Sequence, residues 1–541
     1  MTWSPNATFA ALLDDQQRDE LYAVEISGHG TVFTTGPVSS ASWTYVQSLG
    51  DIEIEAGKVD IARGSWELGT MNFNLENRDG SAAALASIAD LAGRTVTLWM
   101  GFRGLAQANW EKVGTYTIEK ASIEEYGAYA FECIEPFPEL GRALASSLET
   151  GLHATITRPV NFGATRIYID DRTDFALGMT VAIYDGYRYM IRTISAIGYE
   201  TVSGDAQSYI DVPAADQFIS VNGTVARCLS IAGNPVNIAV RILVDDFATV
   251  GSIQTDFPIT AAYGAWTAGD GFGVPLARLD VAAIKAERDA RMSTLVGQVI
   301  FEQLQDDGRG WLDDLCHGVM QLVARRNGLL SIRSCLLPSA AGTPPTIDDT
   351  HARDWAWQRS FSDAYNRVIV EGDLLGRETK QLALVEDAGS IAAIGRRELV
   401  VRSPWLRSAL SGETSAMIIG GRLLARTTSG VENLACVASV GRSVVEAGDP
   451  VLLTHPYMPD TGAGGVPMSG AVAEVAAAAL SLPDNGIHLE TRRYSYARGA
   501  AIAPDSQVDF GSATSLEKSL YAFITEDSGL MPDGSAGYTW V

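Results

Sequence analysis

The side chains that could perform chemistry are spread along the chain, with few groupings. The acidic pairs Asp306-Asp307 and Asp313-Asp314 could suggest a glycosidase, which uses two carboxyl groups facing each other across a cleft. Adjacent acids on a helix usually face water, and the sequence does not place them across a cleft. The acidic segment 170–174 could bind calcium, but it lacks the glycine and the distal glutamate of an EF-hand loop, so we interpret it as a solvated turn.

Nucleophilic catalysis has no support in the sequence. No serine lies in a Gly-x-Ser-x-Gly motif, and Cys316 and His317 are adjacent on a predicted helix, so they point in different directions. The glycine-rich segments 269–273 and 461–465 do not follow a strand and open a helix, so we interpret both as loops and not as phosphate sites. We therefore predict no catalytic, cofactor-binding or metal-binding residues, and no enzyme.

Histidines and cysteines are too scattered for a metal site. Zinc sites need clustered ligands, and no such spacing unites the six histidines at positions 29, 153, 317, 351, 455 and 488. The five cysteines form no Cys-x-x-Cys motif, and we expect buried free thiols in a reducing site of assembly: Cys133, Cys228, Cys316, Cys335 and Cys436.

Composition indicates an acidic globular protein with several domains. The chain has 541 residues, more than one hydrophobic core of roughly 250 to 300 residues would hold. It carries 40 Lys and Arg against 65 Asp and Glu, a net charge of −25. That charge argues against a surface that neutralises nucleic-acid phosphates. The N-terminus lacks the features of a signal peptide, and no apolar run reaches the roughly 18 residues of a membrane span.

The hydrophobic patterns predict a mainly β protein with an α+β middle segment. Residues 1–20 form an N-terminal arm, and 21–150 form a β-rich domain in which Met71, Phe73 and Leu75 alternate with polar residues. Residues 77–80 should close that strand as a turn, and Pro136 and Pro138 open a short helix. Residues 151–232 form an inserted small β-barrel, with turns at Asp185-Gly186 and Asn222-Gly223.

The second half of the chain mixes helices and strands. Residues 233–345 form an α+β domain in which Asn234 and Asp280 begin two helices, a third runs near 310–320, and a hairpin turns at Asn327-Gly328. A linker at 338–349 leads to a second β-rich domain, 346–498, with one helix at 414–426. The C-terminal tail, 499–541, is a disordered end or a docking peptide anchored by Tyr538 and Trp540.

Four stretches, taken in order, resemble the tail hub proteins of long-tailed bacteriophages and prophages. Each is weak alone, and the shared order over most of the chain carries the resemblance. They are GSWELGTMNFNLENRDG followed by LAGRTVTLWMGF and VGTYTIEK; NPVNIAVRILVDD followed by GFGVPLARLDVAAI; WLDDLCHGVMQLVARRNGLLSIR; and SFSDAYNRVIVEGD followed by IGRRELVVRSPWL, LLART and AGDPVLLTHPYMP.

The resemblance implies a virion structural protein of the tail tip or baseplate, assembled in the host bacterial cytoplasm. Residues 21–150 and 346–498 would be two barrel-like hub domains forming a ring, usually a homotrimer, while the inserted barrel projects outward. Expected partners are the distal tail or tube protein, the tape-measure protein and the tail fibre or tip proteins. DNA would pass through an acidic lumen without specific binding.

A second hypothesis makes the chain a receptor-binding tail-tip or fibre-base protein. In that case the inserted barrel would bind a host surface glycan, with Tyr184, Tyr187 and Tyr189 stacking on sugars. The alternative for these tyrosines is an ordinary strand face. A cell-wall hydrolase is the third hypothesis, and the missing catalytic motifs disfavour it.

Overall fold

The structure is a computed structural model of the chain. It describes residues 6–13, 19–39, 42–55, 59–60, 65–66, 69–76, 91–123, 128–134, 137–149, 151–185, 188–325, 327–335, 344–360, 364–372, 379–407, 412–428, 430–439, 445–460, 466–481 and 486–494. The predicted turn at 77–80, Gly186, residues 338–343 of the predicted linker, segment 461–465 and the C-terminal tail lie outside the described residues.

The first part of the chain forms an eight-stranded sheet. Its order is β3 (Tyr45–Val46), β2 (Val32–Thr34), β1 (Glu20–Ile26), β8 (Thr95–Phe102), β9 (Glu111–Ile123), β10 (Tyr129–Ile134), β7 (Thr70–Leu75) and β4 (Leu49–Glu55). The predicted alternation is confirmed in β7, where Met71, Phe73 and Leu75 are buried. A short helix, α1 (Ala7–Leu13), packs on this sheet through Phe9 and Phe102. The two-stranded pair β5 (Val59–Asp60) and β6 (Ser65–Trp66) lies near α5 (Gly308–Cys316), β21 (Met320–Ala324) and β30 (Val466–Ser481).

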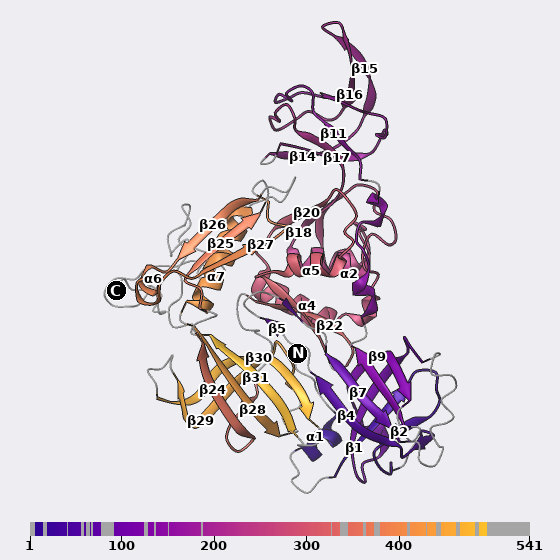
Figure 1. Cartoon of the computed structure of the whole chain (residues 1–541), viewed down its shortest axis with the longest axis vertical. Coiled ribbons are helices and arrows are strands. Elements are labelled where there is room, and N and C mark those ends of the chain that lie inside the picture. The colour runs from indigo at the N-terminus through magenta and orange to yellow at the C-terminus, as the bar shows by residue number, and fades with distance from the viewer. Residues whose placement is uncertain are drawn as a thin grey trace.

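The last part of the chain forms a six-stranded sheet. Its order is β23 (Thr346–Ile347), β29 (Pro450–Asp460), β30 (Val466–Ser481), β31 (Gly486–Tyr494), β28 (Val431–Ser439) and β24 (Ala352–Ser360). These two sheets lie next to each other at the lower end of the molecule in Figure 1, although their strands come from opposite ends of the chain.

One hydrophobic core serves both sheets. Buried side chains of β7, β8 and β10 belong to the same cluster as Leu434, Val475 and Leu489 from the six-stranded sheet. Within it, the rings of Phe73 and Phe131 stack with centroids 4.6 Å apart. We call this the two-sheet core. The two sheets therefore fold as one unit.

A central core lies between the two-sheet core and the inserted unit. It contains the sheet β19 (Ile259–Tyr263), β18 (Leu229–Gly233), β20 (Gly297–Phe301), the hairpin β21 (Met320–Ala324) and β22 (Leu330–Ser334), and the helices α2 (Pro235–Val244), α3 (Ser252–Asp256), α4 (Val281–Glu287) and α5 (Gly308–Cys316). It also takes in a three-stranded sheet and one helix: β26 (Lys380–Glu386), β25 (Arg367–Gly372), β27 (Glu398–Arg402) and α7 (Gly412–Thr427). Helix α6 (Ala388–Ile394) follows β26 and has no buried residues.

Local signals in this middle segment have the expected physical basis. The Asn234 side chain accepts a hydrogen bond from Val236 N, and Asp280 accepts one from Ala283 N, so both predicted helix starts are confirmed. The predicted hairpin is also confirmed, and Gly328 in its turn has a φ of +81°. The third helix, predicted near 310–320, spans 308–316 instead, because Asp307 caps it earlier and the chain then turns into β21.

Residues 151–228 form the inserted β unit, which projects from the rest of the molecule (Figure 1). One sheet has the order β11 (His153–Thr155), β17 (Thr224–Arg227), β13 (Thr180–Tyr184), β14 (Tyr189–Thr193); the other has the order β12 (Arg166–Ile169), β16 (Asp205–Asp211), β15 (Ala196–Val202). Ile167, Ile183 and Val225 contribute to a separate hydrophobic core between these sheets.

The cores divide the chain differently from the predicted domain limits. Residues 137–148, predicted to belong to 21–150, contribute Phe137, Leu144 and Leu148 to the central core. Within 346–498, residues 368–431 also pack in the central core, while the flanking strands belong to the two-sheet core. Strand patterns do not report which sheet a strand joins, so this division was not visible in the sequence.

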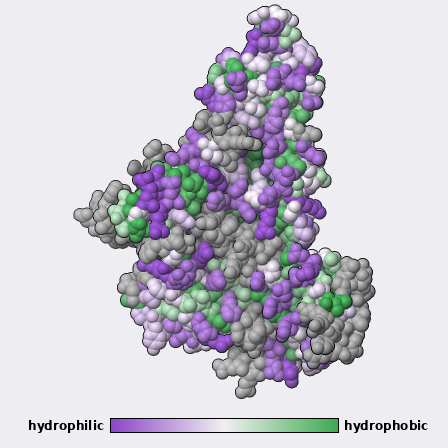
Figure 2. Space-filling model, in the orientation of Figure 1, coloured by the Kyte–Doolittle hydropathy of each residue, from purple (hydrophilic) through white to green (hydrophobic). Residues whose placement is uncertain are grey.

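The molecular surface mixes residue types. On the face shown in Figure 2, hydrophobic and hydrophilic residues alternate in small groups over the coloured part. No helix among the described residues is long and apolar enough to cross a membrane.

The shared core makes a testable prediction about cooperativity. Replacing Leu489, which is 1% exposed, with Ala should lower the free energy of unfolding by about 2 to 5 kcal/mol, because it leaves a cavity. Hydrogen exchange should then increase both in β31 and in the distant strand β8, because one core holds both sheets. Faster exchange confined to the six-stranded sheet would contradict the shared core.

Candidate functional site

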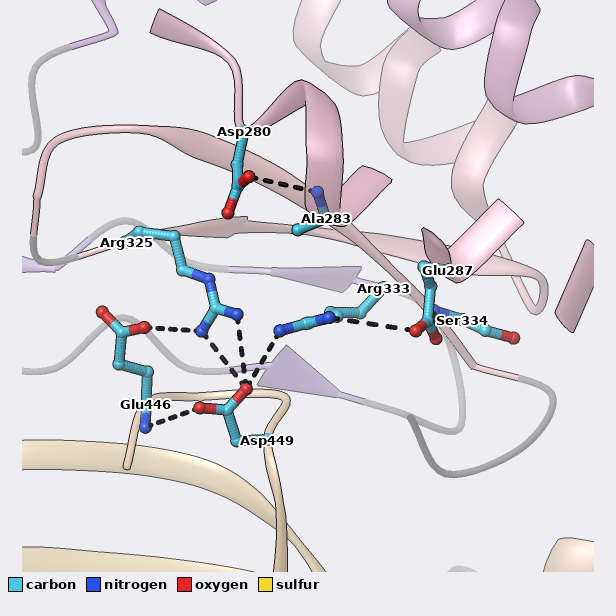
Figure 3. A network of polar contacts seen from close by, with 8 residues as sticks. All are labelled: Asp280, Ala283, Glu287, Arg325, Arg333, Ser334, Glu446 and Asp449. Carbon is cyan, nitrogen blue, oxygen red and sulfur yellow. Dashed lines mark hydrogen bonds and ion pairs between the residues drawn. The ribbon is translucent and has the colours of Figure 1, made fainter. Parts of the chain in front are cut away.

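Five charged side chains meet where the central core borders the two-sheet core (Figure 3). They come from the end of α4, from the hairpin β21–β22 and from the segment that precedes β29. We call them the ion cluster: Glu287, Arg325, Arg333, Glu446 and Asp449. None is more than 6% exposed. The cluster therefore connects two parts of the fold through buried charges.

Asp449 is the centre of the ion cluster. Its Oδ1 accepts hydrogen bonds from both terminal nitrogens of Arg325, each at 3.3 Å, and from Arg333 at 3.0 Å. Its Oδ2 accepts one from the backbone N of Glu446 at 3.2 Å. Arg325 also donates to Glu446 Oε2 at 2.6 Å, and Glu287 Oε2 lies 3.8 Å from Arg333. One carboxylate thus holds both guanidinium groups.

The backbone around Asp449 places its carboxylate against the hairpin. Gly448 has a φ of +81°, and a Cβ there would lie 3.2 Å from Arg333 Cγ. Gly448 N donates to Val475 O at 2.7 Å, and Val475 N donates to Asp449 O at 2.9 Å. The acidic segment is therefore anchored to β30 of the six-stranded sheet, whereas the arginines belong to the hairpin of the central core.

A second buried ion pair crosses the same boundary. Arg426 at the end of α7 contacts Glu474 on β30 and donates to the carbonyl of Cys335 after β22. Removing charges from water costs several kcal/mol per ion, and this cost offsets much of the attraction between the two charges. A buried ion pair therefore contributes little net stability, but it is satisfied only in one relative orientation of the parts that it joins. We infer that these pairs fix the orientation of the two cores.

A cleft of about 610 Å³ lies between the inserted β unit and the central core. Four of its lining residues come from separate candidate groups in the sequence, and the structure brings them together: His153, Asp170, Tyr184 and Asp314. Glu302, Trp311 and Arg407 also line the cleft, and nothing in their local sequence marks them out. Their relation arises only when β20, α5 and the segment after β27 meet the inserted unit.

A tyrosine and a carboxylate connect the two walls of the cleft. Tyr184 on β13 donates a hydrogen bond to Glu302 Oε2 at 2.9 Å, while Glu302 Oε1 has no hydrogen-bond partner among the described residues. Burial raises the pKa of Glu302 above its ordinary value, although the Tyr184 hydrogen bond and the positive charge of Arg407 oppose this. The carboxyl group is therefore easier to protonate than a solvated glutamate.

The tyrosines proposed to stack on sugars face the wrong way. Tyr184 is 7% exposed, and Tyr189 donates to Gln298 Oε1 of β20 at 3.1 Å, so both secure the inserted unit to the central core. Tyr187 lies outside the described residues. Tyr184 and Tyr189 therefore match the alternative of an ordinary strand face, because the sheet that carries them packs on Ile300 of β20.

The other polar candidates have structural roles. Asp171 Oδ1 accepts from Thr173 N at 2.8 Å and from Thr173 Oγ1 at 2.6 Å, which is a side-chain-closed turn. In the predicted loop 269–273, the buried Asp270 accepts from Ser147 N and Thr267 N. Over the described part of the chain, no group of three potential ligands could hold a metal ion.

The five cysteines are buried and free, in agreement with the sequence analysis. Burial raises the pKa of Cys133 and of Cys436 to about 12. Both thiols are therefore protonated at neutral pH and are poor nucleophiles. Cys316 ends α5, and burial raises its pKa as well.

Comparison with known proteins finds no matching family model and no matching curated protein. Among solved structures, the 43 kDa tail protein of prophage MuSo2 from Shewanella oneidensis is similar at 9% identity and a TM-score of 0.36, over 88% of this chain and 99% of that one. A tail protein from Neisseria meningitidis has 10% identity and a TM-score of 0.36, over 88% and 98%. A prophage tail protein from Listeria monocytogenes has 8% identity and a TM-score of 0.36, over 88% and 95%. These likenesses are distant.

Substituting Asp449 tests the ion cluster. We expect Asp449→Asn to lower the free energy of unfolding by about 3 to 5 kcal/mol, because two buried arginines lose their shared carboxylate. Chemical denaturation would measure the loss. The control is Arg402→Met, which breaks the pair with Glu371 where Arg402 is 64% exposed, and should cost less than about 1 kcal/mol. Equal losses in the two variants would contradict the importance given to the cluster.

The pH dependence of stability tests whether burial raises the pKa of Glu302. Because its pKa is raised in the folded protein, its contribution to stability decreases as pH rises above the ordinary value of 4.5. Glu302→Gln should therefore be more stable than the wild type at pH 8, and this difference should shrink as the pH falls to about 4. Thermal denaturation over this pH range would show it.

Glu200 provides a control of opposite sign. Hydrogen bonds from Arg166 and Tyr168 lower the pKa of Glu200, so Glu200→Gln should lose stability at pH 8 and approach the wild type in acid. If both variants change stability in the same direction, burial is not the cause of the Glu302 effect.

Proposed function

We propose that the chain is the structural hub of a bacteriophage or prophage tail tip, forming a ring that joins the tail tube to the distal tip or fibres. The observation that carries the proposal is the two-sheet core, in which buried residues of the eight-stranded sheet pack with Ile347 and with buried residues between 434 and 489 of the six-stranded sheet. In a ring, each subunit presents one folded unit to the lumen. Closed symmetry also requires surfaces on that unit that pair with the neighbouring copies. The order of sequence signals that resembles tail hubs supports the same assignment.

An open sheet edge offers a means of closing the ring. Among the described residues, β24 pairs only with β28, so its other edge has no strand beside it. β24 has nine residues, and Ala356 and Gln358 on it are exposed. Asp354, with a φ of +57°, lies at an irregularity of register between Arg353 and Ala356. Proteins seldom leave a long edge uncovered, because it invites pairing with another chain. In this proposal the edge of β24 contacts the next copy.

Charge is consistent with a conduit. Three copies would carry 3 times −25, or −75, and acidic walls repel a phosphate backbone. DNA would pass through the lumen without specific binding. The tape-measure protein, the tail tube and the fibre or tip proteins would contact the two ends of the ring, and the protein would be located in the virion tail.

In this proposal the two sheets of the two-sheet core and the inserted β unit have separate roles. The two sheets that share the two-sheet core would take the place of the two barrel-like hub domains. The inserted β unit has its own hydrophobic core and extends away from these sheets (Figure 1), so it would face outward. A large permanent interface needs only complementary surfaces. No catalytic step is assigned.

Native mass spectrometry tests the ring. We expect a closed trimer at three times the 57.7 kDa of the chain. The double variant Ala356→Lys, Gln358→Lys adds positive charge to the edge of β24, so its trimer should dissociate into monomers. The free energy of unfolding of the variant should stay within about 1 kcal/mol of the wild-type value.

A lysine on a different edge strand is the matched control. Thr201→Lys lies on β15 of the inserted unit and should leave the trimer intact. A wild-type protein that remains monomeric at all concentrations would contradict the hub. A trimer that resists the double lysine variant would keep the hub but exclude the β24 edge as its interface.

A further inference from the structure

The cleft between the inserted β unit and the central core has the size of a ligand site. Its volume of about 610 Å³ falls within the usual range for small-molecule sites, roughly 300 to 1,000 Å³. Three separate parts of the chain line it: strands β11, β13 and β17; residues 300–314 of β20 and α5; and Pro404 and Arg407. No step of the proposed hub function uses this cleft.

The charges in the cleft disfavour anionic ligands. Asp170, Glu302 and Asp314 contribute three acids to its walls, against the single guanidinium of Arg407. Arg407 is 2% exposed and already donates to the carbonyls of Gln298 and Pro404, at 3.3 and 3.2 Å. A phosphate or a nucleotide would thus meet more negative than positive charge.

The polar walls also disfavour lipids and metal ions. A lipid tail would cover Glu302 Oε1, which has no hydrogen-bond partner among the described residues, without offering it a donor, and this is costly. A metal ion would need clustered ligands, and the described residues contain no such group. The amide and hydroxyl groups of the walls instead suit a ligand with many hydroxyl groups.

The walls have the groups that a sugar ring requires. Trp311, partly buried against the ring of Phe301 at 4.7 Å, provides an aromatic surface for the C–H face of a pyranose. Gln303, Gln305 and Thr155 provide amide and hydroxyl groups that donate and accept. Glu302 Oε1 has no hydrogen-bond partner among the described residues, and a ligand hydroxyl would satisfy it.

We propose that this cleft binds a neutral saccharide, with Trp311 stacking on a sugar ring and Glu302 accepting a hydrogen bond from a hydroxyl group. The Tyr184–Glu302 hydrogen bond holds the carboxylate in place and joins the inserted unit to the site. The site is thus built from both units, and neither half is sufficient alone. The proposal stands whether or not the chain forms a ring.

Titration of the full-length protein with soluble sugars tests the proposal. The probes are the tetrasaccharides of N-acetylglucosamine, of β-1,4-linked glucose and of α-1,4-linked glucose, followed by tryptophan fluorescence and calorimetry. At least one should bind, and Trp311→Ala should weaken its affinity at least tenfold. Gln303→Trp, which fills the cleft from an exposed position, should do the same while leaving the core untouched.

A control on the same unit distinguishes this cleft from other surfaces. Tyr199 is 62% exposed on β15, and Tyr199→Ala should leave the affinity unchanged. Binding that is lost in Tyr199→Ala but retained in Gln303→Trp would overturn the proposal, and so would the absence of binding to all three probes. Sedimentation with insoluble chitin and cellulose then separates two sources: capture of the protein indicates a polymer, and binding of tetrasaccharides alone indicates free sugars; either result supports the site.

Discussion

The eight-stranded and six-stranded sheets must meet, because neither can bury its apolar face by itself. The eight-stranded sheet is complete by residue 134, and most of the six-stranded sheet is made after residue 430. Each supplies one side of the two-sheet core. Between them the chain leaves this core after Cys133, returns at Ile347, leaves again for residues 368–431 and returns at Leu434. The central core and the inserted unit are built from these two excursions.

Buried charge rather than apolar contact defines the boundary between the two cores. Hydrophobic contact is not directional, so it would allow the central core to rotate on the sheets. The Asp449 carboxylate, held by both Arg325 and Arg333, has few geometries in which all partners are satisfied. If the two-sheet core is the wall of a ring, the ion cluster sets the angle at which the rest of the molecule stands on that wall.

Local elements could be predicted from the sequence, and their assembly could not. Asn234, Asp280 and Gly328 act within a few residues of themselves, so caps and turns were visible as patterns. Glu302, Trp311 and Asp449 become informative only through residues more than a hundred positions away or on other elements. The same applies to Tyr184 and Tyr189: an aromatic residue on a strand can face solvent or a neighbouring sheet, and the strand pattern is identical in both cases.

The inserted unit leaves the central core and returns to it at adjacent points. Arg227 N donates to Leu152 O at 2.9 Å, so the entering and leaving strands are hydrogen-bonded neighbours at the base of the unit. A segment whose ends already touch adds almost no loop-closure cost to the protein that hosts it, whatever its length. The inserted unit can therefore be replaced, in nature or by design, by a segment of different size, while the central core and the two-sheet core keep their fold.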